Sequence, residues 1–91
     1  MAIEVRIPTI LRTYTAGQKA VQGSGSTLAE VVDDIDSRHP GLAGRLVEEG
    51  GLRRFINVYV NDEDVRFTGG LQTPVDDGDE VVVLPAVAGG A

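Results

Sequence analysis

The chemistry that this sequence offers is concentrated at its end. An apolar run, Glu80-Val-Val-Val-Leu84, is followed by Pro85 and then by Ala86-Val-Ala-Gly-Gly-Ala91. The β-branched run predicts a buried strand, and pairing should stop at Pro85 because proline cannot donate to a strand ladder. The small residues beyond it cannot build a core, so we expect residues 86–91 to form a mobile tail. Such a tail can deliver the carboxyl group that follows a glycine pair, Gly89-Gly90.

Other side chains give little support for catalysis within the chain. There is no cysteine to act as a nucleophile or metal ligand. His39, the only histidine, precedes a proline at a predicted helix end, where it suits the helix dipole. Asp33, Asp34 and Asp36 fan out around the same helix, so we interpret them as a solvated acidic face. The acidic residues 76–79 are interpreted as a polar turn. They do not match a calcium-binding loop, because the remaining ligands of such a loop are missing. The sequence predicts no enzyme and no bound metal or cofactor.

The size and net charge of the chain limit the classes of function that it can have. The chain has 91 residues, enough for one small domain. Its 8 basic and 14 acidic residues give a net charge of −6, which disfavours nucleic-acid binding. This charge either attracts partners with a basic patch or only keeps the protein soluble. No apolar run approaches the roughly 20 residues of a membrane span, and no signal-peptide pattern begins the chain. We therefore expect a cytoplasmic protein with no membrane or nucleic-acid partner.

Hydrophobic periodicity predicts alternating strands and helices. The clearest element is a helix over residues 27–38, where Leu28, Val31, Val32 and Ile35 form one apolar stripe. Thr27 and Glu30 form a capping box at its start. Strands are predicted over residues 2–7, 18–22, 55–60, 65–67 and 80–84, a short helix over 40–48, and a loop over 68–74.

The order of these elements defines the fold class. A helix between strand pairs requires an α+β layer, with helices on one face of one sheet. The consecutive apolar residues 81–84 predict a central last strand that is covered on both faces and lies beside the first strand. We therefore predict a β-grasp (ubiquitin-like) roll over residues 1–85. It has a mixed sheet with one long and one short helix on one face, and the tail occupies residues 86–91.

Two stretches of sequence resemble a known family. They are Val60-Asn-Asp-Glu-Asp-Val-Arg-Phe-Thr-Gly-Gly-Leu71 and the block from Asp77-Gly-Asp-Glu80 to Leu84-Pro-Ala-Val-Ala-Gly-Gly90. Both resemble the ubiquitin-like sulfur-carrier family of the ThiS/MoaD type. The opening Ile7-Pro-Thr-Ile-Leu-Arg12 is closest to the CysO-like branch.

The resemblance implies a carrier of sulfur. An E1-like enzyme would adenylate the carboxyl group of Gly90 with ATP and Mg, and sulfide would displace AMP to leave a thiocarboxylate. Val87, Ala88 and Gly89 would thread into that partner. A downstream enzyme would accept the sulfur for cysteine, molybdopterin, thiamine or a thiolated metabolite.

One residue departs from the family pattern. Family carriers end at the second glycine, whereas Ala91 follows Gly90 here. Either a peptidase removes Ala91, or this residue is foreign to the natural chain. The resemblance implies a JAMM-type metallopeptidase for the removal.

The sequence also offers candidates for a surface that binds a partner protein. The uncovered face of a β-grasp sheet is a place for partner contacts, and we assign Phe55, Tyr59, Phe67 and Leu71 to it as candidates. Arg53, Arg54 and Arg66 would pair with the partner or solvate an edge. The alternatives to a sulfur carrier are a protein modifier that forms isopeptide bonds through Gly90 and a non-covalent β-grasp adaptor.

Overall fold

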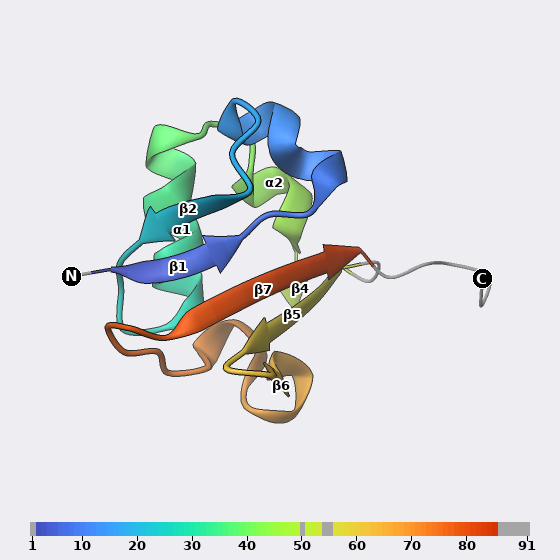
Figure 1. Ribbon diagram of the computed structural model, residues 1–91. Coiled ribbons are helices and arrows are strands. Elements are labelled where there is room, and N and C mark those ends of the chain that lie inside the picture. The colour runs from blue at the N-terminus through green and yellow to red at the C-terminus, as the bar shows by residue number, and fades with distance from the viewer. Residues whose placement is uncertain (1, 50, 54–55, 86–91) are drawn as a thin grey trace.

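The computed structural model describes residues 2–49, 51–53 and 56–85. A five-stranded mixed sheet has the strand order β2-β1-β7-β5-β6, and a two-stranded sheet pairs β3 with β4 (Figure 1). The strands are β1 (Ile3–Arg6), β2 (Ala20–Gly23), β3 (Val47–Glu48), β4 (Gly51–Leu52), β5 (Ile56–Val60), β6 (Glu63–Asp64) and β7 (Glu80–Pro85). The helices are α1 (Leu28–Arg38), α2 (Ala43–Leu46) and the 3₁₀ helices η1 (Thr9–Thr15), η2 (Val65–Phe67) and η3 (Gly70–Gln72). No helix in this described part of the chain is long and apolar enough to cross a membrane.

The first and last strands lie side by side at the centre of the large sheet. β7 runs parallel to β1, with Val5 opposite Val81, and antiparallel to β5, with Val58 opposite Val83. β1 also pairs antiparallel with β2, with Val5 opposite Val21. This arrangement confirms the predicted α+β β-grasp roll, in which one mixed sheet carries a long and a short helix.

Helix α1 begins and packs as its sequence indicates. The hydroxyl of Thr27 accepts a hydrogen bond from the Glu30 N–H (3.3 Å), and the Glu30 carboxylate accepts one from the Ser26 N–H (2.7 Å). The first bond satisfies a donor that the first helical turn leaves free, and the second ties the helix to the residue before its N-cap. The predicted apolar stripe of α1 is buried against the sheet. It joins a core made mainly of valine, isoleucine and leucine from β1, β2, β5 and β7.

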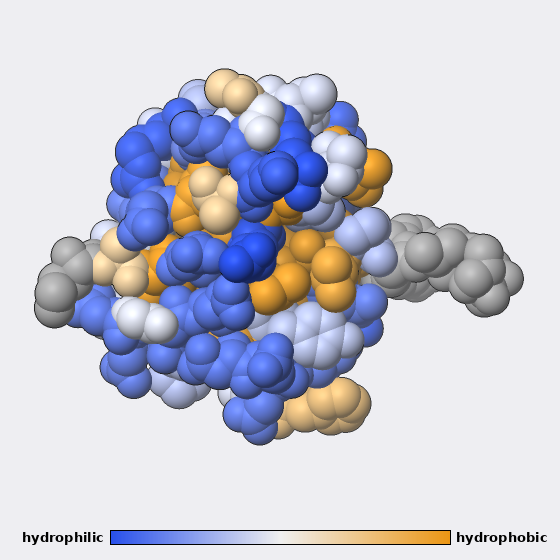
Figure 2. Space-filling view, in the orientation of Figure 1, coloured by the Kyte–Doolittle hydropathy of each residue, from blue (hydrophilic) through white to orange (hydrophobic). Residues whose placement is uncertain are grey.

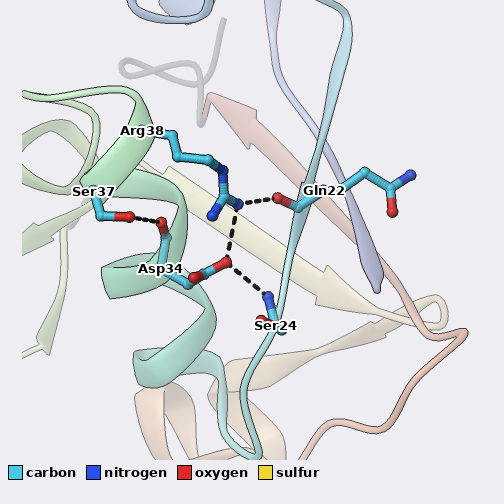
Figure 3. Close-up of polar contacts among 5 residues, drawn as sticks. All are labelled: Gln22, Ser24, Asp34, Ser37 and Arg38. Atoms are coloured by element: carbon cyan, nitrogen blue, oxygen red, sulfur yellow. Dashed lines mark hydrogen bonds and ion pairs between the residues drawn. The ribbon is translucent and has the colours of Figure 1, made fainter. Parts of the chain in front are cut away.

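The polar face of α1 is fastened to the edge strand β2 (Figure 3). The Asp34 carboxylate accepts hydrogen bonds from the Ser24 N–H (3.0 Å) and from Arg38 (2.9 Å), and Arg38 also donates to the Gln22 carbonyl. The bond from Arg38, followed by the bond from Ser24, lowers the pKa of Asp34. Exposed edge strands invite pairing with other chains, and side chains that cover their backbone reduce that risk.

The interpretation of Asp34 and Asp36 as a purely solvated acidic face was therefore wrong. Asp36 Oδ1 accepts hydrogen bonds from the N–H groups of Gly41 (3.1 Å) and Ala43 (3.0 Å), and so holds the start of α2 against α1. Because these short acidic side chains satisfy backbone donors that their own helix does not use, their position on α1 is structural.

Two predicted elements differ from the structure. The short helix covers only Ala43–Leu46, because Val47 and Glu48 leave it to pair with Leu52 and Gly51. The predicted strand over residues 65–67 is the 3₁₀ helix η2, and the strand before it is β6.

The two-residue turn that precedes β6 explains this second difference. Asn61 and Asp62 have positive φ angles of 50° and 71°, which is the backbone of a tight hairpin turn. The hairpin therefore closes two residues earlier than expected, and Glu63 pairs with Val60. Asp64 Oδ1 then accepts the Arg66 N–H (2.9 Å) and begins η2.

Strand β7 is central, but only one of its faces is covered. Val81 and Val83 are 1% and 3% exposed, whereas Leu84 is 45% exposed and Val82 is half-buried. The prediction that both faces of β7 are covered was wrong. The helices that pack on the sheet all contribute to one core, which lies on one side of the sheet. Pro85 is the last paired residue and lies opposite Ile56, so pairing ends at the proline as expected.

This difference between the faces of β7 can be measured on neighbouring residues. Replacing Val83 with alanine removes buried methyl groups, and we expect the free energy of unfolding to fall by about 2 kcal/mol. Leu84→Ala, on the open face, should lower it by less than about 1 kcal/mol. Urea unfolding of the two variants would give both values. Equal losses would contradict a sheet with one open face.

A pair of glycines tests the packing of α1 on β2. A Cβ atom at Gly23 would lie 2.9 Å from Ile35 Cγ2 and 3.0 Å from Val31 Cγ1, whereas a Cβ at Gly44 would have nothing within 4 Å. Because Ile35 and Val31 are fully buried and branched, they cannot move aside. We expect Gly23→Ala to destabilise the protein by about 1–3 kcal/mol. Gly44→Ala should be neutral or stabilising by up to about 1 kcal/mol, and thermal or urea unfolding that ranked the two the other way would contradict this packing.

Candidate functional site

The described structure shows where the predicted tail begins. β7 ends at Pro85 beside β5, and Gly90 follows five residues later in the sequence. Val87, Ala88, Gly89, Gly90 and Ala91 lie outside the described residues. The site that the structure describes is therefore the surface around the end of β7.

An apolar patch lies on the open face of the sheet at this end. Tyr59 of β5 lies opposite Val82 of β7, and Asn57 lies opposite Leu84. Figure 2 shows hydrophobic surface over the C-terminal half of β7, with strongly hydrophilic surface beside it. We call Tyr59, Val82 and Leu84 the open-face patch. Apolar surface in the middle of a sheet that no helix covers is the kind of surface that partners bind.

Charged residues border the patch on the side of β1. Arg6, opposite Val82, has its Nε 2.8 Å from Glu80 Oε2 and 3.2 Å from Glu4 Oε2. The hydrogen bond to Glu80, together with the two negative charges, raises the pKa of Arg6. These side chains are all well exposed to solvent, where such ion pairs add little stability. They link Arg6 of β1 to Glu80, the first residue of β7.

The structure does not bring the four predicted docking residues onto one surface. Tyr59 belongs to the open-face patch, and Phe67, in η2, is 87% exposed. Leu71 is half-buried and lines a shallow groove with Ala29, Val32 and Val47, on the side of the helices. Phe55 lies outside the described residues.

The structure describes two of the three arginines that were predicted to pair with a partner or to solvate an edge. Arg53 Nε donates to the Gly44 carbonyl (2.9 Å), and its Nη1 lies 3.7 Å from Glu48 Oε1. Arg66 Nη2 donates to the Ile56 carbonyl (3.0 Å). Both side chains contact this chain itself. Arg54 lies outside the described residues.

Sequence reasoning missed Val82 and Leu84 as surface residues. The signal that reveals them is the period of two: if Val81 and Val83 face the core, their neighbours face the other side. That rule applies once the sheet is known to have helices on one face only.

Every buried side-chain nitrogen or oxygen atom of the described residues has a hydrogen-bond partner. Buried Thr15 donates to the carbonyl of Gln18 (2.9 Å), and the hydroxyls of Thr68 and Thr73 are 3.0 Å apart. Across residues 2–49, 51–53 and 56–85, no three histidine, aspartate or glutamate side chains lie close enough to hold a metal ion.

Comparison with known proteins agrees with this geometry. The sequence model of the ThiS family matches residues 5–90. The sulfur carrier protein CysO of Mycobacterium tuberculosis is 55% identical, over 99% of this chain and all of its own. The small archaeal modifier protein 3 of Haloferax volcanii is 37% identical over the same shares.

A solved structure is similar throughout. It is a chain of the Amycolatopsis orientalis BexX/CysO complex, which has a TM-score of 0.93 and 62% identity and covers 98% of this chain and 100% of its own. The family model matches nearly the whole chain, and the fold agrees with that of the solved relative. The chain therefore belongs to the ThiS family of ubiquitin-like β-grasp proteins.

Proposed function

We propose that this protein is a sulfur carrier that works through the carboxyl group of Gly90. After Ala91 is removed, an E1-like enzyme adenylates that carboxyl group, and sulfur replaces AMP to give a thiocarboxylate. A biosynthetic enzyme then accepts the sulfur. The protein is a co-substrate in this sequence, and the catalytic groups, ATP and Mg²⁺ belong to its partner.

The observation that carries the proposal is where the family match ends. It includes Gly90 and leaves out Ala91. The 55% identical relative, matched over its whole length, bears the name of a sulfur carrier protein. Together they support Gly90 as the residue that carries the reacting carboxyl group.

The chemistry requires activation because a carboxylate has no good leaving group. Attack of the Gly90 carboxylate on the α-phosphorus of ATP forms an acyl adenylate and releases pyrophosphate. Attack by a sulfur nucleophile at the acyl carbon then breaks the bond to AMP, which leaves with its electron pair. Glycine at this position keeps side-chain atoms away from the reacting carbon.

The fold supports this role by fixing where the tail begins. β7 is held by neighbours on both sides, so Pro85 has a defined position relative to the open-face patch. A partner that binds Tyr59, Val82 and Leu84 would hold the start of the tail at a set distance from its own active site.

Ala91 sets a further requirement. It places the terminal carboxyl group one residue, about 3.5 Å, beyond the carboxyl carbon of Gly90. A peptidase that cleaves after the glycine pair would supply the competent form, and a JAMM-type metallopeptidase is our candidate.

A second function shares the same activated glycine. The relationship to an archaeal modifier protein favours attachment of Gly90 to a lysine amine of another protein, with AMP as the leaving group. Activation would be identical, and the partner that acts next would decide between sulfur transfer and conjugation.

The requirement for trimming is directly testable. The chain that ends at Gly90 should release pyrophosphate when mixed with its E1-like enzyme, ATP and Mg²⁺, and the chain that ends at Ala91 should be inactive or at least about a hundredfold slower. A displacement of even 1 Å at such a site can cost this much. Gly90→Ala in the trimmed chain should also react slowly, with an unchanged unfolding midpoint. If both lengths are activated equally fast, Gly90 is not the acceptor.

A further inference from the structure

A groove beside the end of β7 is basic in a protein that is otherwise acidic. Its walls include residues from β1, from η1 and the turn after it, and from the last part of β7. We call it the root groove and define it by Arg6, Ile10, Arg12, Lys19, Leu84 and Pro85. Three of the eight basic residues of the chain line it, and no acidic residue does. Because Arg6 is paired with Glu4 and Glu80, the positive charge of the groove comes from Arg12 and Lys19.

The acidic residues are concentrated at the other end of β7. Half of the fourteen lie in two segments, residues 62–64 and 76–80. The first segment follows β5, whose last residue Val60 pairs with Val81, and the second leads into β7. The protein therefore has a charge asymmetry along β7, negative where the strand begins and positive where it ends. Such an asymmetry orients a molecule as it approaches a charged partner.

The side chain of Arg12 and the backbone of Lys19 are both bonded to Ile7. The N–H of Ile7 donates to the Lys19 carbonyl (2.8 Å), and the Ile7 carbonyl accepts from Arg12 Nε (3.1 Å). The segment between them is closed by bonds to the Arg12 carbonyl from the Gly17 N–H (2.7 Å) and the Thr15 hydroxyl (3.3 Å). The guanidinium of Arg12 is therefore positioned in the groove before any partner arrives, which reduces the entropy that binding would remove. The backbone of Lys19 is fixed beside it, and the exposed Lys19 side chain starts from that position.

The groove also exposes apolar groups that a solvated ion site would not need. Ile10 is 64% exposed and Leu84 is 45% exposed. The occupant that fits both features has carboxylates for Lys19 and Arg12 and an apolar side chain for Ile10 and Leu84.

We propose that the root groove binds an acidic, partly apolar segment at the entrance of the enzyme that receives the tail. This inference rests on the proposed function, because Pro85 lines the groove and the tail follows it. An enzyme that takes up residues 86–90 must place its entrance within a few residues of Pro85, and therefore against this groove. The groove then selects among tail-binding enzymes by the charge around their entrances.

The test is the kinetics of pyrophosphate release by the E1-like enzyme, with the chain that ends at Gly90 as substrate. Lys19→Gln should raise KM about two- to fivefold at low ionic strength with kcat unchanged, as expected for an exposed charge pair at an interface rim. Lys19→Arg should restore KM, and high salt should reduce the difference. Ile10→Ser should raise KM at both ionic strengths, because salt does not screen an apolar contact.

The matched control is Gln72→Glu, which changes the net charge by the same amount as Lys19→Gln but lies in η3, outside the groove. It should leave KM within about 1.5-fold. Thermal unfolding of each variant checks that the fold is retained.

The outcomes separate the two proposals. Normal activation with an unchanged KM for Lys19→Gln and Ile10→Ser would overturn the root groove alone. An equal rise with Gln72→Glu would also overturn it, because net charge rather than the groove would then set the affinity. Competition by inorganic phosphate that Lys19→Gln abolishes would assign the groove to a small anion instead. If the trimmed wild-type chain is not activated, the proposed function fails and the groove proposal fails with it.

Discussion

The structure depends on one constraint: helices cover one face of the five-stranded sheet, and the central strand of that sheet is also its last in the sequence. β7 is held between β1 and β5, so the end of the chain leaves from the middle of the sheet. Because helices bury Val81 and Val83 on one side, Val82 and Leu84 are left toward solvent on the other. The buried face fixes β7, and the open face leaves the open-face patch accessible beside Pro85.

The remaining contacts preserve this arrangement at the edges of the sheet. Asp34 and Arg38 fasten α1 to β2, while Arg6 joins the neighbouring strands β1 and β7 through Glu80. Ile7, the residue after β1, binds the side chain of Arg12 and the backbone of Lys19 with its two backbone groups. The basic side of the root groove is thus anchored directly after the strand that pairs with β7.

Much of the fold was predictable from the sequence because strong local signals agreed with one another. The cap at Thr27, the apolar stripe of α1 and the alternation in β1 all led to the observed elements. Predictions failed where pairing between segments decided the outcome. Asn61 and Asp62 make a two-residue turn with positive φ, which removed the strand expected at residues 65–67. The placement of the docking candidates could not be predicted, because Tyr59, Phe67 and Leu71 come from elements whose relative positions no local pattern specifies. Leu84 was missed because a run of four apolar residues conceals the period of two.

The central claim is that Gly90 becomes a thiocarboxylate, and the intact mass of the protein from its own host tests it most directly. The account predicts a species that has lost Ala91, about 71 Da, and carries about 16 Da more than the resulting carboxylate, because one sulfur replaces one oxygen. Alkylation by a thiol reagent should shift this species, since the chain itself has no cysteine. A host protein found only with Ala91 and an ordinary carboxyl group would contradict the account. So would a ladder of adducts to lysines of other proteins without the sulfur-bearing form.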